Sequence, residues 1–477
     1  MKMISLLTLA AVLLLPAALS AEEIPTITAI MENGPSENRI NIVFLSEAYV
    51  ASQRETYFND VAIATEGLFN FTPFKEYQNY FNVYAIWVAS QDSFLANVAR
   101  GEEPRTYFGQ WGGLGADGEK ARLVMRSFFP SPGPIVTIML ENDDRVTGVG
   151  GKDEGLVFIG GVVVGTGRLH HDPDITPVMY VGTVVHEFGH TLGLQDEYNG
   201  TLVLRPGETE SNSSINVTTE TNRNRIKWKH WIEPATPIPT PWSEVLEFSD
   251  NGIGRYTQIS AYADKVGLFE GANSYTKGWY RPRLNCAMRG VRAWGEEQLP
   301  FCEVCREALV LEIYRQVDPT AFPDVTVGDE STTFSINNLP QPLDHNLKIQ
   351  WLVDGQVMPE QNSTSLQISD SDVKPPRFNI VEIGYGRHTV TVQVVDTTEF
   401  VRKDSEGLLV RSVEWRPIVI YPKPDFSDDG KVDFDDFFMF ADIFGQAKTK
   451  SREKFDLDWD GKIDFNDFFL FADAFGK

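Results

Sequence analysis

Cysteine is scarce in this sequence, which holds three cysteines among 477 residues. One thiol is left over in any pairing within the chain unless a partner supplies another. Basic residues are also few, because 42 Lys and Arg face 67 Asp and Glu and give a formal charge of −25. Nucleic acids and anionic membranes repel such a charge, so we expect neither as a partner.

Long apolar runs are lacking after the first twenty residues. Lys2 provides a positive start, residues 4–15 form an apolar run, and residues 18–20 form a small-residue cleavage site. These features predict a secretory signal over residues 1–20 and a mature chain that begins near Ala21. The run is too short to span a bilayer and no later stretch qualifies. We therefore expect a secreted protein, extracellular or associated with the cell surface, in which disulfides are permitted.

The stretch from His186 to Asp196 carries the strongest chemical signal. On a helix, His186 and His190 project from one face, where two imidazoles can hold one Zn²⁺. Glu187 is turned aside from this pair and can activate a water on the zinc without being a ligand, as a general base for peptide hydrolysis requires. Gly193 permits a sharp turn that brings Asp196 to the metal. Three protein ligands and one open position are typical of a catalytic zinc.

The spacing H-E-x-x-H-x-x-G-x-x-D resembles the metzincin zinc motif, with aspartate in place of the third histidine. Further motifs follow in the order seen in the M64 peptidases, the IgA-peptidase family. They are residues 41–45, 80–84, 196–198, 266–272, 280–282, 286–288 and 301–307. The resemblance covers about residues 36–315 and implies a zinc endopeptidase with an α/β metzincin-like domain. It does not imply that immunoglobulin A is the substrate.

The same resemblance implies that Met288 is the Met-turn, an apolar floor beneath the zinc. Many metzincins carry a tyrosine two residues later, but Gly290 occupies that position here. A tyrosine that assists the oxyanion therefore cannot be assigned from the Met-turn. Tyr280 is the remaining candidate, and a structural role is its more ordinary interpretation.

Two smaller clusters of possible ligands flank the zinc motif. A disulfide from Cys286 to Cys302 or Cys305 would tie the Met-turn to the next helix, whereas a three-cysteine zinc site lacks an evident fourth ligand. His170 and His171 begin a run of five residues that could hold a second metal. A polar loop on the cleft wall is the alternative interpretation of that run.

Hydrophobic periodicity predicts the order of elements. Strands are expected over residues 39–47, 80–90, 134–140 and 156–165, and helices over 53–69, 118–129 and from 176 onward. This order predicts an α/β sheet with the zinc-motif helix packed on it. The polar residues 199–245 are predicted to form an insertion that rims the cleft or contacts substrate.

The pattern becomes all-β after the peptidase-like region. Alternating stretches at 347–353, 365–368, 388–395 and 408–415, with Asp354-Gly355 as a hairpin signal, predict a small β-sandwich of immunoglobulin-like (Ig-like) type. The Cys-Trp-Cys core of a true immunoglobulin domain is missing.

The tail contains a duplicated loop followed by a helix. Each loop has glycine at position 6, a main-chain carbonyl at position 7 and oxygen ligands at positions 1, 3, 5, 9 and 12, which predicts about two Ca²⁺ sites. The predicted ligands are Asp425, Ser427, Asp429, Lys431, Asp433 and Asp436 in the first loop, and Asp456, Asp458, Asp460, Lys462, Asp464 and Asp467 in the second.

This duplicated tail resembles the type I dockerins, which implies docking to a cohesin on a scaffold or cell surface. Loop positions 10 and 11, where dockerins often carry small hydroxyl residues, are Phe434-Asp435 and Phe465-Asn466. This departure leaves a cohesin-like partner and a surface-retention role both open.

The predicted organisation has four parts. They are a signal peptide over 1–20, an M64-like zinc metallopeptidase domain over 21–322, an Ig-like β-sandwich over 323–422 and a small all-α dockerin-like EF-hand pair over 423–477. We expect a secreted zinc endopeptidase with one catalytic Zn²⁺, a protein or peptide substrate and a calcium-dependent docking module. The alternatives are a metal-dependent amidase acting on cell-wall peptides and a non-catalytic surface-binding protein. The intact Glu187 argues against the second alternative.

Overall fold

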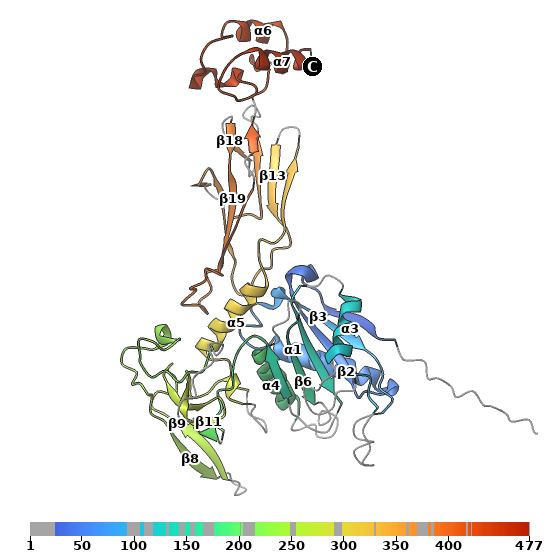
Figure 1. The fold of residues 1–477 in the computed structure, drawn as a ribbon, viewed down its shortest axis with the longest axis vertical. Helices are drawn as coiled ribbons and strands as arrows, with labels where there is room; N and C mark the ends of the chain where they lie inside the picture. The colour runs from blue at the N-terminus through green and yellow to red at the C-terminus, as the bar shows by residue number, and fades with distance from the viewer. Residues whose placement is uncertain are drawn as a thin grey trace, which may run out of the picture.

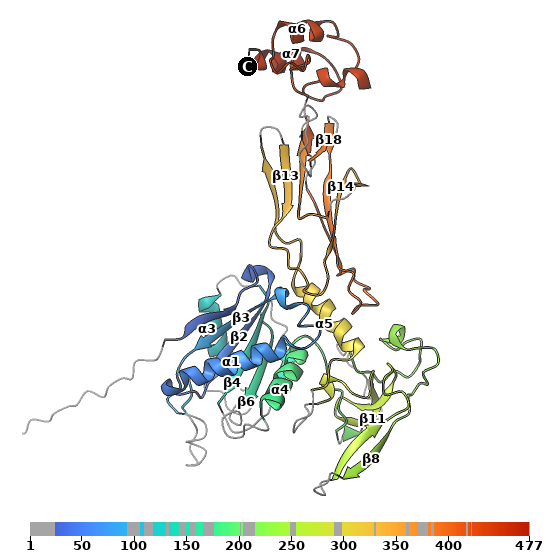
Figure 2. The ribbon, with the colours of Figure 1, turned by 180° about the vertical axis from the view of Figure 1, so that it is seen from behind.

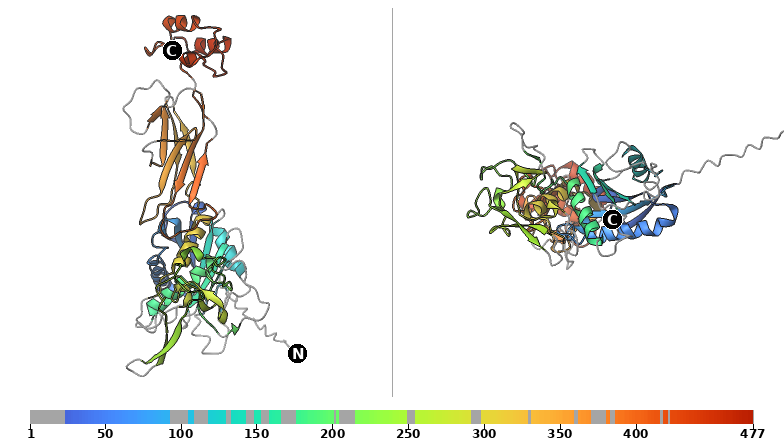
Figure 3. Two further views of the ribbon diagram at one scale, coloured as in Figure 1. Left: turned by 90° about the vertical axis from the view of Figure 1, so that its left-hand side faces the viewer. Right: turned by 90° about the horizontal axis from the view of Figure 1, so that it is seen from below.

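Three units follow one another along the long axis of the molecule (Figure 1, Figure 3). A broad α/β unit lies at one end, a β-rich unit in the middle and a small helical unit at the other end. The computed structural model describes residues 24–92, 105–108, 118–129, 133–142, 148–152, 158–165, 176–200, 202–203, 215–248, 254–290, 298–328, 331–358, 362–369, 380–382, 386–415, 418–420 and 422–476.

A six-stranded mixed sheet organises the first unit, with strand order β1-β3-β2-β4-β6-β5. The four central strands are parallel, whereas β1 and β5 run antiparallel at the two edges. The strands are β1 (Thr26–Met31), β2 (Ile40–Glu47), β3 (Phe81–Trp87), β4 (Ile135–Glu141), β5 (Gly148–Lys152) and β6 (Phe158–Gly165). The strands predicted over 39–47, 80–90, 134–140 and 156–165 are thereby confirmed.

Helices cover both faces of this sheet, because successive side chains of a strand point to opposite sides (Figure 1, Figure 2). Ile42 and Phe44 belong to the core shared with α1 (Arg54–Leu68) and α4 (Thr176–Thr191). Val43 and Leu45 pack in a separate core with α3 (Gly118–Phe128). All three helices lie where the sequence predicts them.

Helix α4 is apolar on the side that meets the sheet and α1. Tyr180, Val184 and Phe188 are fully buried there. A Cβ atom on Gly67 of α1 would lie 2.5 Å from the methyl carbons of Val181, so this glycine permits the two helices to approach closely. Each buried apolar side chain stabilises the fold by about 1.5–3 kcal/mol. Packing against the sheet and α1 therefore fixes the position of the helix that carries the zinc motif.

The rest of the first unit is built from short elements. Strands β10, β11 and β7 form one sheet and β8 and β9 form a hairpin. The strands are β7 (Leu202–Val203), β8 (Ser243–Phe248), β9 (Gly254–Ile259), β10 (Phe269–Ala272) and β11 (Tyr275–Arg281). Among the described residues, the 3-10 helices of the unit are η1 (Ser36–Asn38), η2 (Ala51–Gln53), η3 (Gln78–Tyr80), η5 (Lys229–Trp231) and η6 (Ala287–Arg289). Helix α5 (Glu303–Gln316) ends the unit.

Part of the stretch predicted to rim the cleft lies in the main core instead. Ile226, Trp228 and Trp231 are buried among the residues of that core. The indole N–H of Trp228 donates to the carbonyl of Gly267 at 2.9 Å, which satisfies its polar atom. These aromatic residues anchor the described part of the stretch to the unit.

The middle unit contains two four-stranded sheets with orders β12-β13-β16-β17 and β15-β14-β19-β20, and a pair of β18 with β21. Phe334 from one sheet and Trp351 and Val392 from the other share a single core. Asp354 and Gly355 both have positive φ at the β14–β15 turn, which fits the predicted hairpin. The strands are β12 (Pro323–Val327), β13 (Ser331–Ile336), β14 (Lys348–Val353), β15 (Gln356–Val357), β16 (Ser365–Ser369), β17 (Ile380–Glu382), β18 (Gly386–His388), β19 (Val390–Val395), β20 (Val410–Glu414) and β21 (Ile418–Ile420).

The first two units are joined by Asp396, which follows β19 and is buried. Its Oδ2 atom accepts from the hydroxyls of Tyr77 and Tyr314, each at 2.7 Å. His345 contacts its Oδ1 atom at 2.7 Å. Leu408 from the middle unit is part of the core of the first unit. The α/β unit therefore depends on contacts from beyond its predicted end at residue 322.

The last unit contains α6 (Phe434–Ala441), η7 (Lys450–Phe455) and α7 (Phe465–Ala474). Phe426, Phe440, Phe455 and Phe471 form most of its own small core. Over the part of the chain that the structure describes, no helix is long and apolar enough to cross a membrane.

Candidate metal centre

The three predicted zinc ligands converge at the end of α4. Oδ1 of Asp196 lies 3.1 Å from Nε2 of His186 and 3.2 Å from Nε2 of His190. Gly193 has φ +93°, a conformation that favours glycine, and there the chain leaves the helix and turns back. One ligand atom from each residue lies within 4.8 Å of the others. The sequence-predicted set is thus brought together.

Backbone carbonyls orient both imidazole rings. Nδ1 of His186 lies 2.9 Å from the carbonyl oxygen of Ala287, and Nδ1 of His190 lies 2.9 Å from that of Leu194. A carbonyl only accepts, so each Nδ1 carries a proton. Nε2 is therefore the nitrogen of each ring that gives up its proton and becomes the ligand when a metal binds.

The geometry and charge of this group fit a zinc ion. Tetrahedral bonds of about 2.0–2.1 Å place neighbouring ligand atoms roughly 3.3 Å apart, close to the distances between Asp196 and the two histidines. Burial would raise the pKa of Asp196, but hydrogen bonds to His186 and His190 hold that pKa well below its usual range. The carboxylate is therefore ionised, and two nitrogens with one oxygen would leave a tetrahedral ion a fourth position for a reactant.

Glu187 follows His186 on the helix and packs against the edge strand β5. A Cβ atom on Gly148 would lie 2.5 Å from Cγ of Glu187, and one on Gly150 would lie 2.3 Å from its main-chain oxygen. The glycines thus permit close contact between strand and helix. Glu187 is 8% exposed. Burial raises the pKa of its carboxyl, and the positive charge of the histidines offsets only part of this effect.

Met288 lies directly beneath α4. Its side chain is fully buried, and a Cβ atom on Gly189 would lie 2.7 Å from its sulfur. The N–H of Glu197 donates to the carbonyl of Met288 at 2.7 Å, which links the turn to the segment that carries Asp196. This position agrees with an apolar floor under the two histidines.

Tyr198 is a candidate that the sequence interpretation missed. Its ring stacks on that of His186, with centroids 6.4 Å apart and an interplanar angle of 21°. Burial, and then the nearby charge of Asp196, raise the pKa of the Tyr198 hydroxyl. By contrast, Tyr280 lies in β11 opposite Glu270 and bonds through its backbone to Thr218. The sequence did contain a signal for Tyr198, because its hydroxyl lies two residues after Asp196, the last predicted zinc ligand.

The expected disulfide is replaced by three thiols in the structure. Cys286, Cys302 and Cys305 are all free and buried. The sulfur atoms of Cys286 and Cys305 lie 3.7 Å apart, whereas a disulfide requires about 2.05 Å. Glu197 completes this group, with Oε1 3.0 Å from the sulfur of Cys305. His170 and His171, the other predicted cluster, lie outside the described residues.

The sequence matches the IgA Peptidase M64 family over residues 28–260 and 254–313. The chain belongs to this peptidase family. The match confirms the family resemblance, includes both residue groups described above, and ends before the β-sandwich unit. A comparison with curated proteins finds no match. Family membership supports a peptidase, which is a hydrolase that acts on a protein or peptide. The mixed α/β fold is compatible with that activity.

Outside the family match, the second tail loop of this M64 peptidase gathers three predicted calcium ligands. Asp456, Asp458 and Asp467 place carboxylate oxygens within 4.8 Å of one another. Asp456 and Asp467 are fully buried, and Oδ1 of Asp456 has no hydrogen-bond partner among the described residues. Lys448 partly neutralises the group, with Nζ 2.6 Å from Oδ2 of Asp456. Asp460 and Lys462 continue the loop, where the N–H of Lys462 donates to Asp460.

The first loop is arranged differently. Asp425 accepts from the backbone N–H groups of Asp429 and Gly430, and Ser427 donates to it at 3.3 Å. Its carboxylates do not form a comparable three-residue group within the described part of the chain. The N–H of Lys431 donates to Asp429. At position 9 of each loop, Asp433 and Asp464 cap α6 and α7, and at position 12 Asp436 and Asp467 complete the two capping boxes.

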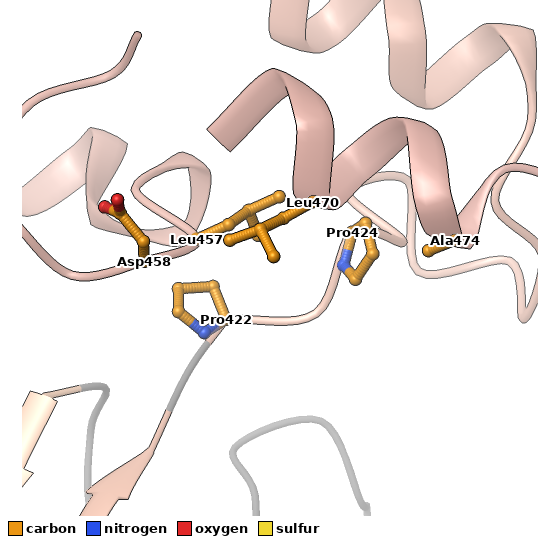
Figure 4. Close-up of a pocket in the computed structure, with 6 residues that line it drawn as sticks. All are labelled: Pro422, Pro424, Leu457, Asp458, Leu470 and Ala474. Carbon is orange, nitrogen blue, oxygen red and sulfur yellow. The ribbon is translucent and has the colours of Figure 1, made fainter. Parts of the chain in front are cut away.

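A pocket adjoins the second loop (Figure 4). It is lined by the linker prolines Pro422 and Pro424, by Leu457 and Asp458 of the loop, and by Leu470 and Ala474 of α7. Most of this lining is apolar. It lies between the last unit and the segment that connects it to the β-sandwich.

Proposed function

We propose that this M64 peptidase is a secreted zinc endopeptidase that hydrolyses peptide bonds of extracellular proteins. The observation that carries the proposal is the convergence of Asp196 Oδ1 on Nε2 of His186 and of His190, at 3.1 and 3.2 Å. A zinc ion held there would polarise the scissile carbonyl and increase the acidity of the attacking water. The residues around the site perform the remaining steps.

Glu187 is the base in this proposal. Its carboxylate takes a proton from the attacking water as the new carbon–oxygen bond forms, and it then gives that proton to the leaving amide nitrogen. Burial raises the pKa of Glu187, which makes its carboxylate a stronger base than an exposed one. Its contact with Gly148 limits the directions in which the side chain can move.

Tyr198 and β5 position the substrate. The hydroxyl of Tyr198 lies close enough to Asp196 for the charge of that carboxylate to raise its pKa, and it can donate to the carbonyl oxygen as negative charge builds there. Strand β5 is an edge of the sheet and pairs with β6 alone among the described strands. An extended peptide can add to such an edge by main-chain hydrogen bonds. This mode of binding favours cleavage within a chain.

The duplicated tail acts in the proposal as a calcium-dependent docking module. Phe434 and Phe438 on α6 are 65% and 60% exposed, and the matching Phe465 and Phe469 on α7 are each 65% exposed. Large apolar side chains that are exposed together mark a surface that a partner covers. A cohesin-like or cell-surface protein is the proposed partner.

The test is the Glu187→Gln variant, assayed on casein. It should lose about 10²–10⁴-fold in hydrolysis while it keeps its zinc and its circular dichroism spectrum, because an amide cannot accept the proton. Glu66→Gln, an exposed position on α1, is the matched control and should retain full activity. Hydrolysis by Glu187→Gln at the wild-type rate would contradict the role of the base.

Assays of the wild type on casein and on cell-wall peptides distinguish the endopeptidase from the two alternatives. A wild-type protein that spares casein but cleaves cell-wall peptides is a metal-dependent amidase. A protein that hydrolyses neither, yet binds zinc, is a non-catalytic surface-binding protein. Release of internal casein fragments supports the endopeptidase.

A further inference from the structure

Four buried side chains meet beside the Met288 turn. Glu197 follows Asp196, Cys286 precedes η6, Cys302 precedes α5, and Cys305 lies in the first turn of α5. Glu197, Cys286 and Cys305 are fully buried and Cys302 is 5% exposed. One ligand atom from each of the four lies within 4.8 Å of the others. Each is a residue type that binds metals.

The separations within this group are near those around a tetrahedral ion, with the pair of Glu197 and Cys305 shorter. Bonds of about 2.3 Å to sulfur and 2.0–2.2 Å to oxygen place the ligand atoms roughly 3.5–3.8 Å apart. The sulfurs of Cys286 and Cys305 lie 3.7 Å apart. Oε1 of Glu197 lies 3.0 Å from the sulfur of Cys305 and 3.9 Å from that of Cys302.

The surroundings of the group leave a polar atom unsatisfied. Oε2 of Glu197 is buried without a hydrogen-bond partner among the described residues. Its Oε1 atom also accepts from the side-chain amide of Asn216 at 3.0 Å, and the N–H of Cys302 donates to the sulfur of Cys286 at 3.3 Å. Such contacts commonly orient metal ligands from outside the coordination shell. The buried guanidinium of Arg281 adds positive charge near Glu197 and Cys286.

We propose that Cys286, Cys302, Cys305 and Glu197 bind a second zinc ion with a structural role. Three thiolates select zinc over harder cations, and four protein ligands close the coordination shell, so no position is left for a reactant. The burial of all four residues also excludes substrate. The proposal does not depend on a metal at His186 and His190.

This second ion would connect the segments that shape the first centre. Glu197 is bonded to Asp196, and Cys286 is bonded to Ala287, whose carbonyl orients His186. The backbone bond from Glu197 to Met288 joins the same two segments. Loss of the second ion should therefore loosen Asp196 and His186 together.

Cobalt substitution of the full-length chain tests the proposal. Thiolates bound to Co²⁺ give an intense near-ultraviolet charge-transfer band that histidine and carboxylate ligands do not give, and the chain has three cysteines. We expect two Co²⁺ per chain outside the tail, with this band present. His190→Ala should lose one ion and keep the band, whereas Cys302→Ser should lose one ion and most of the band.

A thiol count on the wild-type chain provides a second readout that does not require a variant to fold. After denaturation in chelator without reductant, alkylation should label three cysteines. One labelled cysteine would reveal a disulfide and overturn the proposal. Absence of the charge-transfer band from cobalt-loaded wild-type protein would overturn it as well. Neither result would bear on the centre at His186, which the casein assay tests separately.

Discussion

Asp196 and Glu197 are neighbours in the chain, yet their carboxylates contact different clusters. Oδ1 of Asp196 lies 3.1 Å from Nε2 of His186, and Oε1 of Glu197 lies 3.0 Å from the sulfur of Cys305. Outside a helix, successive side chains can point to opposite sides of the backbone. A single peptide unit thus connects the candidate catalytic centre to the cysteine cluster, and a change at either residue can affect both.

Replacement of Asp196 by alanine should weaken zinc retention. The variant keeps two imidazole ligands but loses the ionised carboxylate between them, so dialysis against a mild chelator should remove its zinc well before that of the wild type. Asp264→Ala, an exposed aspartate, is the control and should retain zinc normally. Elemental analysis measures the outcome. Equal zinc content in both variants would show that another residue is the third ligand, and Glu197 is the nearest carboxylate in the sequence.

Tyr198→Phe should lower kcat by about 10²-fold with little change in KM, because the hydroxyl is proposed to act on charge that develops only in the transition state. The zinc content should stay at the wild-type level, since the ring still stacks on His186. Tyr262→Phe is the control at a half-buried tyrosine outside the centre. An unchanged kcat in Tyr198→Phe would leave the tyrosine with a packing role only.

Local pattern predicted most of the α/β unit. Residues 39–47 place apolar side chains on both faces of a strand, and they form β2 (Ile40–Glu47) between two helical layers. The spacing of His186 and His190 fixes their common face as soon as the segment is helical, and Gly193 supplies the turn that Asp196 needs. These relationships involve residues close in sequence, so one sequence was enough to predict them.

Contacts between distant residues could not be predicted in this way. Cys305 and Glu197 are 108 positions apart, and no periodicity connects a carboxylate after α4 with a thiol in α5. Tyr77 and Asp396 are 319 positions apart. Their hydrogen bond makes the middle unit part of the support of the first, whereas the change to an all-β pattern after residue 322 indicated a boundary. Only the tertiary fold shows these pairs.

The contact between His345 and Asp396 predicts a pH dependence of stability. Burial would lower the pKa of His345, but hydrogen bonds to Asp396 and Asp344 raise it above the ordinary value of about 6.5. A pKa that is higher in the folded state stabilises the fold fully below about pH 6.5, and this stabilisation is lost as the pH rises through the folded-state value.

Thermal unfolding of the wild type and of His345→Gln measures this effect. The difference in Tm should be largest near pH 6 and should shrink by about pH 8.5, because glutamine does not titrate there. Comparison within one pH value cancels the titration of other groups. A difference in Tm that stays constant over this range would show that His345 acts through packing alone.

Calcium should protect the tail of the full-length protein from proteolysis. Asp456 and Asp467 are fully buried beside Asp458, so their negative charges repel one another until a cation binds. In chelator, cleavage should therefore begin within residues 423–477. Asp456→Ala should lose the protection by calcium, whereas Asp442→Ala, an exposed aspartate on the same unit, should keep it. A tail that resists protease equally in calcium and in chelator would contradict the calcium sites.

The core of this unit, built around Phe426 and Phe440, is separate from that of the α/β unit, so hydrolysis of a small peptide should continue after the tail is removed. A large loss of small-peptide activity would mean that the tail completes the catalytic unit.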